Sequence, residues 1–389
     1  MRILFLSAWF PYPADNGSKL RILNLLSGLS TQHEITLLSF ADNPQNAQVN
    51  GLQNICKSVQ VLPNKDYNAR SSRAILGILG RKPRVLADRF VSESDNVVQK
   101  VLSSGSHDLV IASQIYTADY LTGLAGIPAI FDEVEVGFFT DAVQQADNLM
   151  HQTRNQLTLF KLQSYFRRLL PNFSTSTVVS ETEKILLQNL VPDYPSIKVI
   201  PNGVNLTSYQ EVVEQPQPGS LIFSGALTFA PNYHAMQWFA GEVLPLIVQE
   251  NPDVRLTITG NHGGKALPDD QRVKLIGYVD DIRPLIASSW ISIAPIFSGG
   301  GTRLKILEAF GLQTPVIATS KGAEGLEVQH GKHLLIADSA EAFAHETTRL
   351  LIDEDLRYEL TENAYRLTKE KYDWQVIIPK FLSLIEAVI

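Results

Sequence analysis

The feature that most constrains the fold of this chain is an alternation of short apolar, β-rich segments with helical patterns, which occurs in two series. In the first series, the apolar segments are Arg2–Ser7, Glu34–Ser39, Asp108–Ser113, Ala129–Phe131, Thr175–Val179 and Ile197–Ile200. In the second, they are Leu221–Ser224, Arg255–Thr259, Val273–Ile276, Trp290–Ala294, Val316–Thr319 and His333–Ile336. Such alternation predicts parallel sheets covered by helices on both faces. The chain is therefore expected to be α/β, with two doubly wound domains in tandem.

The expected domain boundary is a polar segment that contains two prolines and a glycine, Tyr209–Ser220. It separates an N-terminal domain over 1–208 from a C-terminal domain over 209–371. The length of 389 residues accommodates two domains of this size. Ligands of doubly wound sheets bind outside the carboxyl ends of the strands, so two such domains predict a site in the cleft between them.

Composition excludes several classes of protein. A single cysteine, Cys56, excludes a disulfide scaffold and a cysteine-based metal site. No apolar segment reaches the roughly 20 residues of a membrane-spanning helix. The 33 basic and 40 acidic residues give a net charge of −7, which argues against a nucleic-acid binder. The apolar segment Ile3–Phe10 is short and is followed by prolines, so we interpret it as a buried strand and expect a cytoplasmic protein.

The densest motif is the glycine triplet Gly299, Gly300 and Gly301, which follows a predicted strand and precedes a helix expected from near Thr302. Backbone N–H groups at a helix N-terminus bind anions, and glycine lets a phosphate approach closely. Arg303 and Lys305 add positive charge at this end, where it opposes the helix macrodipole. An anionic ligand would offset that repulsion.

Spacing within the motif extends this interpretation. Gly301, Lys305 and Glu308 are separated by four and three residues, which would place them on one helix face. A diphosphate could meet the amide and the ammonium, and a ribose diol could meet the carboxylate. The alternative is a glycine-rich turn followed by a solvated Lys–Glu pair.

The motif and the segments around it resemble the donor-site signature of the family-4, GT-B-fold retaining glycosyltransferases. The run Gly299–Glu308 and the segment Val199–Val204 (Val-Ile-Pro-Asn-Gly-Val) are the most specific parts of the resemblance, which covers almost the whole chain. The remaining segments are the first strand with the Gly17 loop, Val178–Glu183, Gly277–Asp281 and Ala294–Ser298. A subgroup of the family shares the sequence Gly-Gly-Gly-Thr-Arg-Leu-Lys.

The resemblance implies two Rossmann-like domains that face a cleft, with the last helix, about 372–389, packed back on the first domain. It implies transfer of a sugar from a nucleotide-diphosphate donor to an acceptor, with the anomeric configuration retained and without a metal or other cofactor. Its implied donor-binding residues are Gly17, Gly225, Tyr278, Val279, Gly299, Gly300, Gly301, Thr302 and Glu308. Among these, Glu308 resembles the ribose-binding glutamate, and Tyr278 and Val279 occupy the positions that cup the base. Arg303 and Lys305 are the implied catalytic residues that hold the diphosphate.

The sequence departs from the family pattern in three places. Gly300 stands where a first, sugar-contacting glutamate is usual, and we expect Glu324 to supply the missing carboxylate, unless it is only a solvated loop residue. The loop 225–232 lacks its usual basic residue. Asp132 and Glu133 replace a common histidine, and we expect them on the acceptor side.

Two stretches without acidic residues, 70–84 and 148–180, combine basic and apolar side chains. They suit the anionic inner face of the cell membrane, or they are ordinary solvated helices. A polysaccharide, a lipid-linked glycan or another glycan is the expected acceptor, and no nucleic acid is expected as a partner. The alternative functions are a GT-B sugar-nucleotide epimerase or phosphorylase and a non-catalytic protein that binds a sugar nucleotide.

Overall fold

A computed structural model of the chain describes residues 1–121, 124, 126–146 and 148–389. The chain divides into two compact units, one formed by Met1–Asn202 with Ile378–Ile389 and the other by Gly203–Ile377. Residues just after Asn202 belong to the second unit because the Val204 N–H donates to Tyr372 O at 2.8 Å, and the Trp374 N–H donates to Val204 O at 3.1 Å. The expected boundaries, 208/209 and 371/372, lie a few residues from these divisions.

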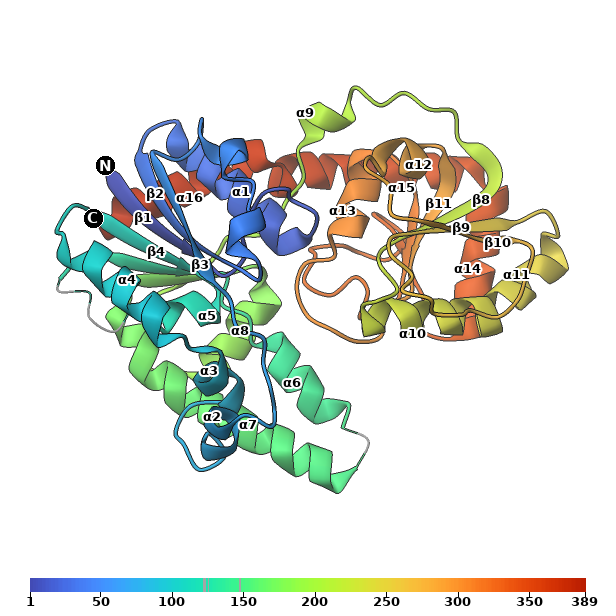
Figure 1. Cartoon of the computed structure of the whole chain (residues 1–389). Coiled ribbons are helices and arrows are strands. Elements are labelled where there is room, and N and C mark those ends of the chain that lie inside the picture. The colour runs from blue at the N-terminus through green and yellow to red at the C-terminus, as the bar shows by residue number, and fades with distance from the viewer. Residues whose placement is uncertain (122–123, 125, 147) are drawn as a thin grey trace. The chain divides into compact units, whose positions relative to one another are not determined.

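The described residues of the first unit form a parallel sheet in the order β3-β2-β1-β4-β5-β6-β7 (Figure 1). Its strands are β1 (Arg2–Ser7), β2 (Glu34–Ala41), β3 (Ser58–Pro63), β4 (Leu109–Ser113), β5 (Ala129–Asp132), β6 (Thr175–Val178) and β7 (Ile197–Val199). Sequence analysis missed β3. This edge strand is only partly buried, so its residues lack the continuous apolar character of the central strands.

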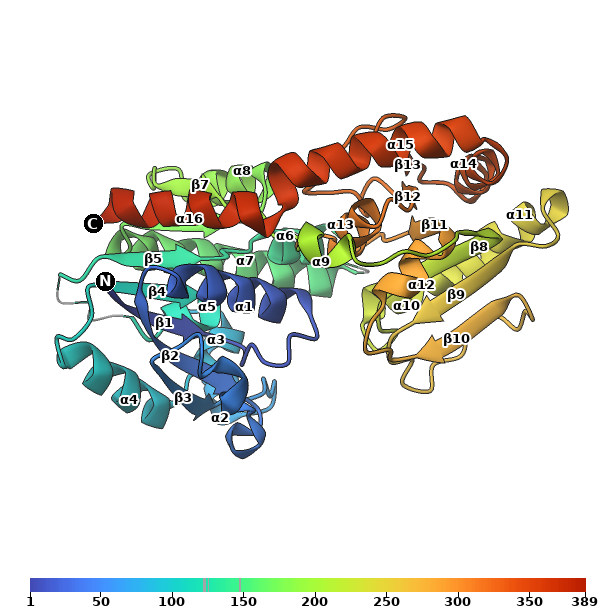
Figure 2. The ribbon, with the colours of Figure 1, turned by 90° about the horizontal axis from the view of Figure 1, so that it is seen from above.

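Helices cover this sheet. They are α1 (Gly17–Ser30), α2 (Ser72–Leu76), α3 (Arg84–Arg89), α4 (Ser92–Ser103), α5 (Ile115–Ala118), α6 (Gly137–Gln144), α7 (Leu149–Leu169) and α8 (Glu181–Leu190). The end of α16 (Trp374–Val388) joins them (Figure 2). Ile378 of α16 packs so closely on Gly28 of α1 that a Cβ on the glycine would lie 2.5 Å from the isoleucine side chain. Short 3₁₀ turns occur at Pro44–Asn46, Val49–Leu52 and Leu170–Asn172.

The second unit repeats the architecture with a parallel sheet in the order β10-β9-β8-β11-β12-β13. Its strands are β8 (Gln217–Ser224), β9 (Arg255–Thr259), β10 (Val273–Gly277), β11 (Ser289–Ala294), β12 (Val316–Ala318) and β13 (Leu335–Ile336). Its helices are α9 (Leu206–Tyr209), α10 (Ala230–Trp238), α11 (Leu244–Glu250), α12 (Arg283–Ala287), α13 (Leu304–Gly311), α14 (Ala340–Ile352) and α15 (Glu354–Leu367). Single π-helical turns follow α10 and α15 at Phe239–Val243 and Thr368–Tyr372.

Strand β8 shows why the second sheet needs helices on both faces. Leu221 and Phe223 belong to one buried apolar cluster, and Ile222 between them belongs to another. Successive side chains of a strand point to opposite faces, so both faces of the sheet carry a core. The predicted doubly wound α/β class is confirmed.

Each sheet has a switch point, where the strand order reverses. It lies between β1 and β4 in the first unit and between β8 and β11 in the second. Crevices outside the carboxyl ends of the strands at such points bind ligands. Among the described residues, no helix has the length and apolar character needed to span a bilayer.

Candidate functional site

Three neighbouring strands of the second unit end in a glycine. Gly225 follows β8, Gly260 follows β9 and Gly277 ends β10, with φ angles of 154°, 91° and 74°. A Cβ on Gly260 would lie 2.6 Å from the backbone nitrogen of Ala226, and the Gly260 N–H donates to Gly277 O at 2.7 Å. Backbone without side chains therefore forms this edge of the sheet, where a ligand can approach closely.

The glycine triplet lies across the switch point, in the loop between β11 and α13. Gly299 and Gly301 have φ angles of 91° and 79°. Sequence analysis placed Gly301 on a helix that begins near Thr302. That expectation was wrong, because the positive φ of Gly301 and the ψ of 79° at Arg303 keep both residues out of the helix, which starts at Leu304. Lys305 and Glu308 remain one turn apart on α13.

Lys305 extends from α13 toward the end of β8. Its Nζ lies 3.2 Å from Oδ1 of Asn232 and 3.8 Å from the centre of the Phe223 ring. Asn232 is held in turn, since its Nδ2 donates to Ala226 O at 3.0 Å. A Cβ on Gly225 would lie 3.0 Å from the Lys305 Nζ, so the glycine makes room for the ammonium group.

The surroundings of Lys305 destabilise its positive charge. Burial, the largest cause, and the positive charge of Arg303 together lower its pKa to about 7, against the opposing effect of Glu308. The ammonium group at the glycine-lined edge is therefore poised near neutral pH, and a bound anion would favour its charged form.

Arg303 closes the glycine loop on itself. Its Nη1 donates to Gly300 O at 2.8 Å, and its Nη2 donates to the carbonyl oxygens of Ser298 and Gly299. Thr302, in the same loop, and Ser224, at the end of β8, each have a buried hydroxyl oxygen that finds no hydrogen-bond partner in the described part of the chain. The loop thus has a fixed shape, and polar atoms at this edge are left to meet a ligand.

Glu308 is partly buried on α13. Burial raises the pKa of its carboxyl, and Lys305 counteracts this effect. Tyr209, which sequence analysis assigned to the linker, packs so closely on Gly311 of α13 that a Cβ there would lie 2.6 Å from the tyrosine ring. Burial and the nearby Glu308 charge both raise the pKa of Tyr209.

The other expected residues of the second unit lie at neighbouring strand ends. Tyr278 and Val279 follow the edge strand β10, and the Tyr278 side chain is 68% exposed. Three strand spacings separate β10 from β11, or about 14 Å. Glu324 follows β12, is exposed and pairs with Lys321.

In the first unit, Gly17 begins α1, where the side chain of Asn16 caps the helix. Asp132 ends β5 and is fully buried in a two-pronged ion pair with Arg21, with N–O distances of 2.6 and 3.0 Å. Thr177 also donates to Asp132, at 2.6 Å, and the Arg21 guanidinium donates to Asn202 Oδ1 at 2.9 Å. Both carboxylate oxygens of Asp132 therefore accept hydrogen bonds from side chains of the first unit.

Glu133, the next residue, has a left-handed backbone with a φ angle of 60°. The pKa of its carboxyl is raised to about 8, mainly by burial and also by the neighbouring Asp132 and Glu135 charges, against the lowering effect of Arg21. Its Oε2 accepts a hydrogen bond from Gln114, which also has a positive φ, of 72°. Strained residues of this kind are typical of functional sites.

Sequence analysis missed Asn232, Gly260 and Tyr209. Gly260 could have been found, because it is a glycine that directly follows the predicted strand Arg255–Thr259. Asn232 and Tyr209 carry no local signal, since their roles depend on contacts across the fold. Among the described residues, no cluster of three or more His, Cys, Asp or Glu side chains could hold a metal ion.

Comparison with known proteins bears on this site directly. Residues 218–353 match the model of the family described as glycosyl transferases group 1. The matched segment lies within the second unit and includes the glycine-lined strand ends, Lys305 and Glu308.

Several curated proteins are similar to this chain. An uncharacterized 44.6 kDa protein in the cps region of Klebsiella pneumoniae is 25% identical over 393 residues, which cover 96% of each chain. The putative glycosyltransferase YtcC of Bacillus subtilis is 27% identical over 51% of this chain and 56% of its own length. The phosphatidyl-myo-inositol mannosyltransferase of Mycobacterium tuberculosis is 28% identical over 49% of this chain and 53% of its own.

Solved structures match the fold over the whole chain. Anabaena HepE, in complex with UDP and glucose, is 17% identical with a TM-score of 0.69, and both chains are covered completely. Sucrose-phosphate synthase from Thermosynechococcus elongatus is 15% identical with a TM-score of 0.73, over 100% of this chain and 99% of its own. The fold is GT-B, with two Rossmann-like domains.

Proposed function

We propose that this chain is a retaining glycosyltransferase that moves a sugar, of the hexose type, from a nucleoside-diphosphate donor to a glycan acceptor. The observation that carries the proposal is the position of Lys305, at the switch point of the glycosyl transferases group 1 domain, against Gly225 and Asn232. Negative charge grows on the diphosphate as the glycosidic bond breaks. An ammonium group already in place stabilises that charge without reorganisation.

Different parts of the donor bind at the ends of neighbouring strands. The glycine loop Gly299–Thr302, which Arg303 holds in shape, and Gly225 receive the diphosphate beside Lys305. Glu308 takes the ribose hydroxyls, and Tyr278 and Val279 contact the base. The solved complexes of HepE with UDP and with UDP-glucose support a nucleotide sugar as the donor.

Three further assignments complete the donor site. Glu324 orients the hydroxyls of the donor sugar in place of the glutamate missing at Gly300, and Gly17 lies near the diphosphate and the acceptor. No metal is required, because Lys305 and backbone amides supply the positive charge. Full activity in excess chelator tests the last assignment.

The acceptor is a polysaccharide or a lipid-linked glycan. A relative named phosphatidyl-myo-inositol mannosyltransferase supports a lipid-linked acceptor. Exposed apolar residues also favour contact with a membrane, on its cytoplasmic face: Leu76 and Leu79 are 71% and 92% exposed, and Arg70, Arg73 and Arg81 lie beside them in the chain. The segment from the end of α2 to Leu79 is fixed to α7, because Lys161 donates to the carbonyl oxygens of Gly77 and Ile78.

Release of nucleoside diphosphate tests the function. A panel of nucleotide sugars is incubated with a glycan or lipid-linked glycan acceptor, and the anomeric configuration of the product is read by NMR. A transferase releases the diphosphate faster when acceptor is present, and a retaining one preserves the configuration of the donor. Conversion of the donor to an isomer without acceptor would instead identify an epimerase, and binding without turnover would identify a non-catalytic protein.

A further inference from the structure

The first unit contains a cavity of about 810 Å³ at its own switch point. Trp9 follows β1, Gln114 follows β4 and Glu133 follows β5, so the cavity lies outside the carboxyl ends of these strands. Residues of α3, α6 and α7 and the segment 67–69 complete the wall. This is the place in a doubly wound sheet where a ligand is expected.

Two arginines of this wall have hydrogen-bonding capacity to spare. Among the residues that the structure describes, the buried Nε atoms of Arg84 and Arg89 have no hydrogen-bond partner. The Arg84 guanidinium donates to Ala69 O at 2.6 Å, and the Arg89 guanidinium donates to Asn64 Oδ1 at 3.1 Å. Within the described ranges, neither forms an ion pair with a carboxylate at 4 Å or less.

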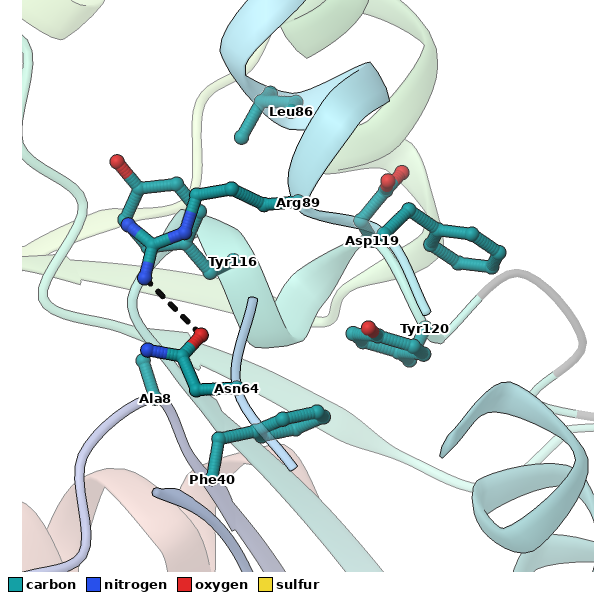
Figure 3. A pocket seen from close by; sticks show the side chains of 9 residues that line it. Ala8, Phe40, Asn64, Leu86, Arg89, Tyr116, Asp119 and Tyr120 are labelled. Carbon is teal, nitrogen blue, oxygen red and sulfur yellow. Dashed lines mark hydrogen bonds between the residues drawn. The ribbon is translucent and has the colours of Figure 1, made fainter. Parts of the chain in front are cut away.

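Arg89 is held in position by aromatic rings. Its guanidinium carbon lies 4.0 Å from the centre of the Tyr116 ring and 5.9 Å from that of Trp9. Figure 3 shows the guanidinium group over Tyr116, with its hydrogen bond to Asn64. These residues also line a separate small cavity of about 20 Å³. A guanidinium group fixed in this way loses little freedom when it binds an anion.

The charged side chains of the cavity lining are three arginines and two glutamates. Arg84, Arg89 and the exposed Arg154 line it, together with Glu133 and the exposed Glu135. Burial lowers the pKa of the Lys161 ammonium group, and the positive charge of the nearby Arg84 lowers it as well. Asp88, beside Arg89 in the chain, is fully buried and already binds Lys65 at 2.7 Å. Because the pKa of Glu133 is raised to about 8, this carboxyl is largely neutral at pH 7, and the three arginines outnumber the remaining lining carboxylate, Glu135.

The rest of the lining is largely apolar and aromatic, with Phe138 and Phe139 from α6 and Tyr67 below Arg84. Sugar rings and isoprenoid chains both pack on such surfaces. The cavity therefore combines a cationic wall with room for a ring or a chain.

We propose that this cavity binds an acceptor that carries a phosphate or diphosphate group, with Arg84 and Arg89 donating to the phosphate oxygens. The inference rests on the proposed function, because it names the class of acceptor for that reaction. Guanidinium groups match phosphate oxygens in two-pronged geometry and bind them strongly. The group can belong to a sugar phosphate or to a lipid-linked phosphate.

Equilibrium binding to the full chain, measured calorimetrically without donor, tests the proposal independently of turnover. The probes are a hexose 1-phosphate, a short isoprenoid phosphate and the corresponding uncharged hexose and isoprenoid alcohol. Either phosphate is expected to bind at least tenfold more tightly than its uncharged partner. The phosphate that binds more tightly identifies the source of the group. R84Q and R89Q should each weaken phosphate binding about tenfold or more, the loss expected for a charged hydrogen bond.

Two controls make the result specific. R167Q removes an exposed charge on α7 outside the cavity and should leave binding unchanged. K305A disables the proposed donor site and should also leave phosphate binding intact. If K305A abolishes phosphate binding while R84Q and R89Q retain it, the phosphate binds to the second unit instead.

Equal affinity for the charged and uncharged probes would overturn the proposal. Melting temperatures verify folding, and R89K, which keeps the charge but loses the fork, should still bind more weakly if R89Q does not fold. Failure of sugar transfer with intact phosphate binding would count against the proposed function alone.

Discussion

The Nζ atom of Lys305 lies 3.2 Å from Oδ1 of Asn232, which is a neutral acceptor. In the part of the chain that the structure describes, no carboxylate forms an ion pair with this ammonium group at 4 Å or less. A partly buried cation with so little compensation is unfavourable by itself and is suited to an anionic ligand.

Lys305 and Glu308 should affect different kinetic constants. Lys305→Ala should lower kcat by about two to three orders of magnitude, because the charge it stabilises grows in the transition state. Glu308→Ala should mainly raise the donor KM, because the ribose does not change during transfer. The expected increase corresponds to a loss of about 1–3 kcal/mol of donor binding free energy. Donor-saturation kinetics of both variants, with melting temperatures, measure this. If Lys305→Ala changes only KM while Glu308→Ala abolishes kcat, the two roles are reversed, and Glu308 takes part in the chemical step.

Donor binding should also depend on pH through Lys305. Its pKa of about 7 rises when a diphosphate binds, so binding takes up protons near neutral pH. The affinity for nucleoside diphosphate is then greatest below pH 7 and falls as pH rises above it, by up to about tenfold per pH unit. Calorimetry in buffers of different ionisation enthalpy measures the uptake. Lys305→Arg, whose charge is permanent, should abolish it, and an unchanged uptake in this variant would assign the proton to another group.

Much of the fold could be predicted because its central strands are buried on both faces and therefore nearly continuously apolar. Leu109–Ser113 of β4 is an example, with all five residues buried. The edge strand β3 lacks that signal, so it was missed. The start of α13 was placed too early because Gly301 continues the spacing of Lys305 and Glu308, although its positive φ excludes it from the helix.

The site could be predicted only where its chemistry is local in sequence. The glycine loop and Lys305 form one continuous motif. In contrast, Arg21 and Asp132 are separated by 111 residues. Nothing in the segment around Asp132 indicates that its carboxylate forms an ion pair with a distant arginine. The direction of the Arg303 side chain, toward the carbonyl oxygens of its own loop, is likewise a matter of local geometry that residue type does not specify.

Asp132 should act on stability rather than on the acceptor. Asp132→Asn leaves the Arg21 charge buried and unpaired, which should cost about 3–5 kcal/mol of unfolding free energy. Denaturant unfolding measures the loss. The matched control is Asp108→Asn, which breaks the exposed pair with Arg2 and should have a much smaller effect. A stable Asp132→Asn variant with a raised acceptor KM would restore the acceptor-side expectation for this residue.

Glu133 should make stability fall as pH rises. Its pKa is about 8 in the folded chain and near its ordinary value when unfolded, so the folded state holds the extra proton between about pH 4.5 and 8. Stability is lost across this window and levels off above it. Glu133→Gln, which does not titrate, should therefore gain melting temperature relative to wild type from pH 5 to pH 8. Glu386→Gln, at an exposed carboxyl of α16, should show no such trend, and a pH-independent difference for Glu133→Gln would contradict the assignment.

The exposed leucines near α2 should hold the protein on anionic vesicles. Leu76→Ser with Leu79→Ser removes two side chains that would enter the interface, and Arg70→Gln with Arg81→Gln removes two charges worth about 1 kcal/mol each near such a surface. Co-sedimentation with vesicles should weaken for both double variants, and only the arginine contribution should disappear at high salt. Ile352→Ser, at a position of the second unit that is 73% exposed, controls for loss of any surface apolar residue. The proposed membrane contact is wrong if the wild type does not sediment with anionic vesicles at low salt, or if Ile352→Ser releases it as fully as the leucine variant.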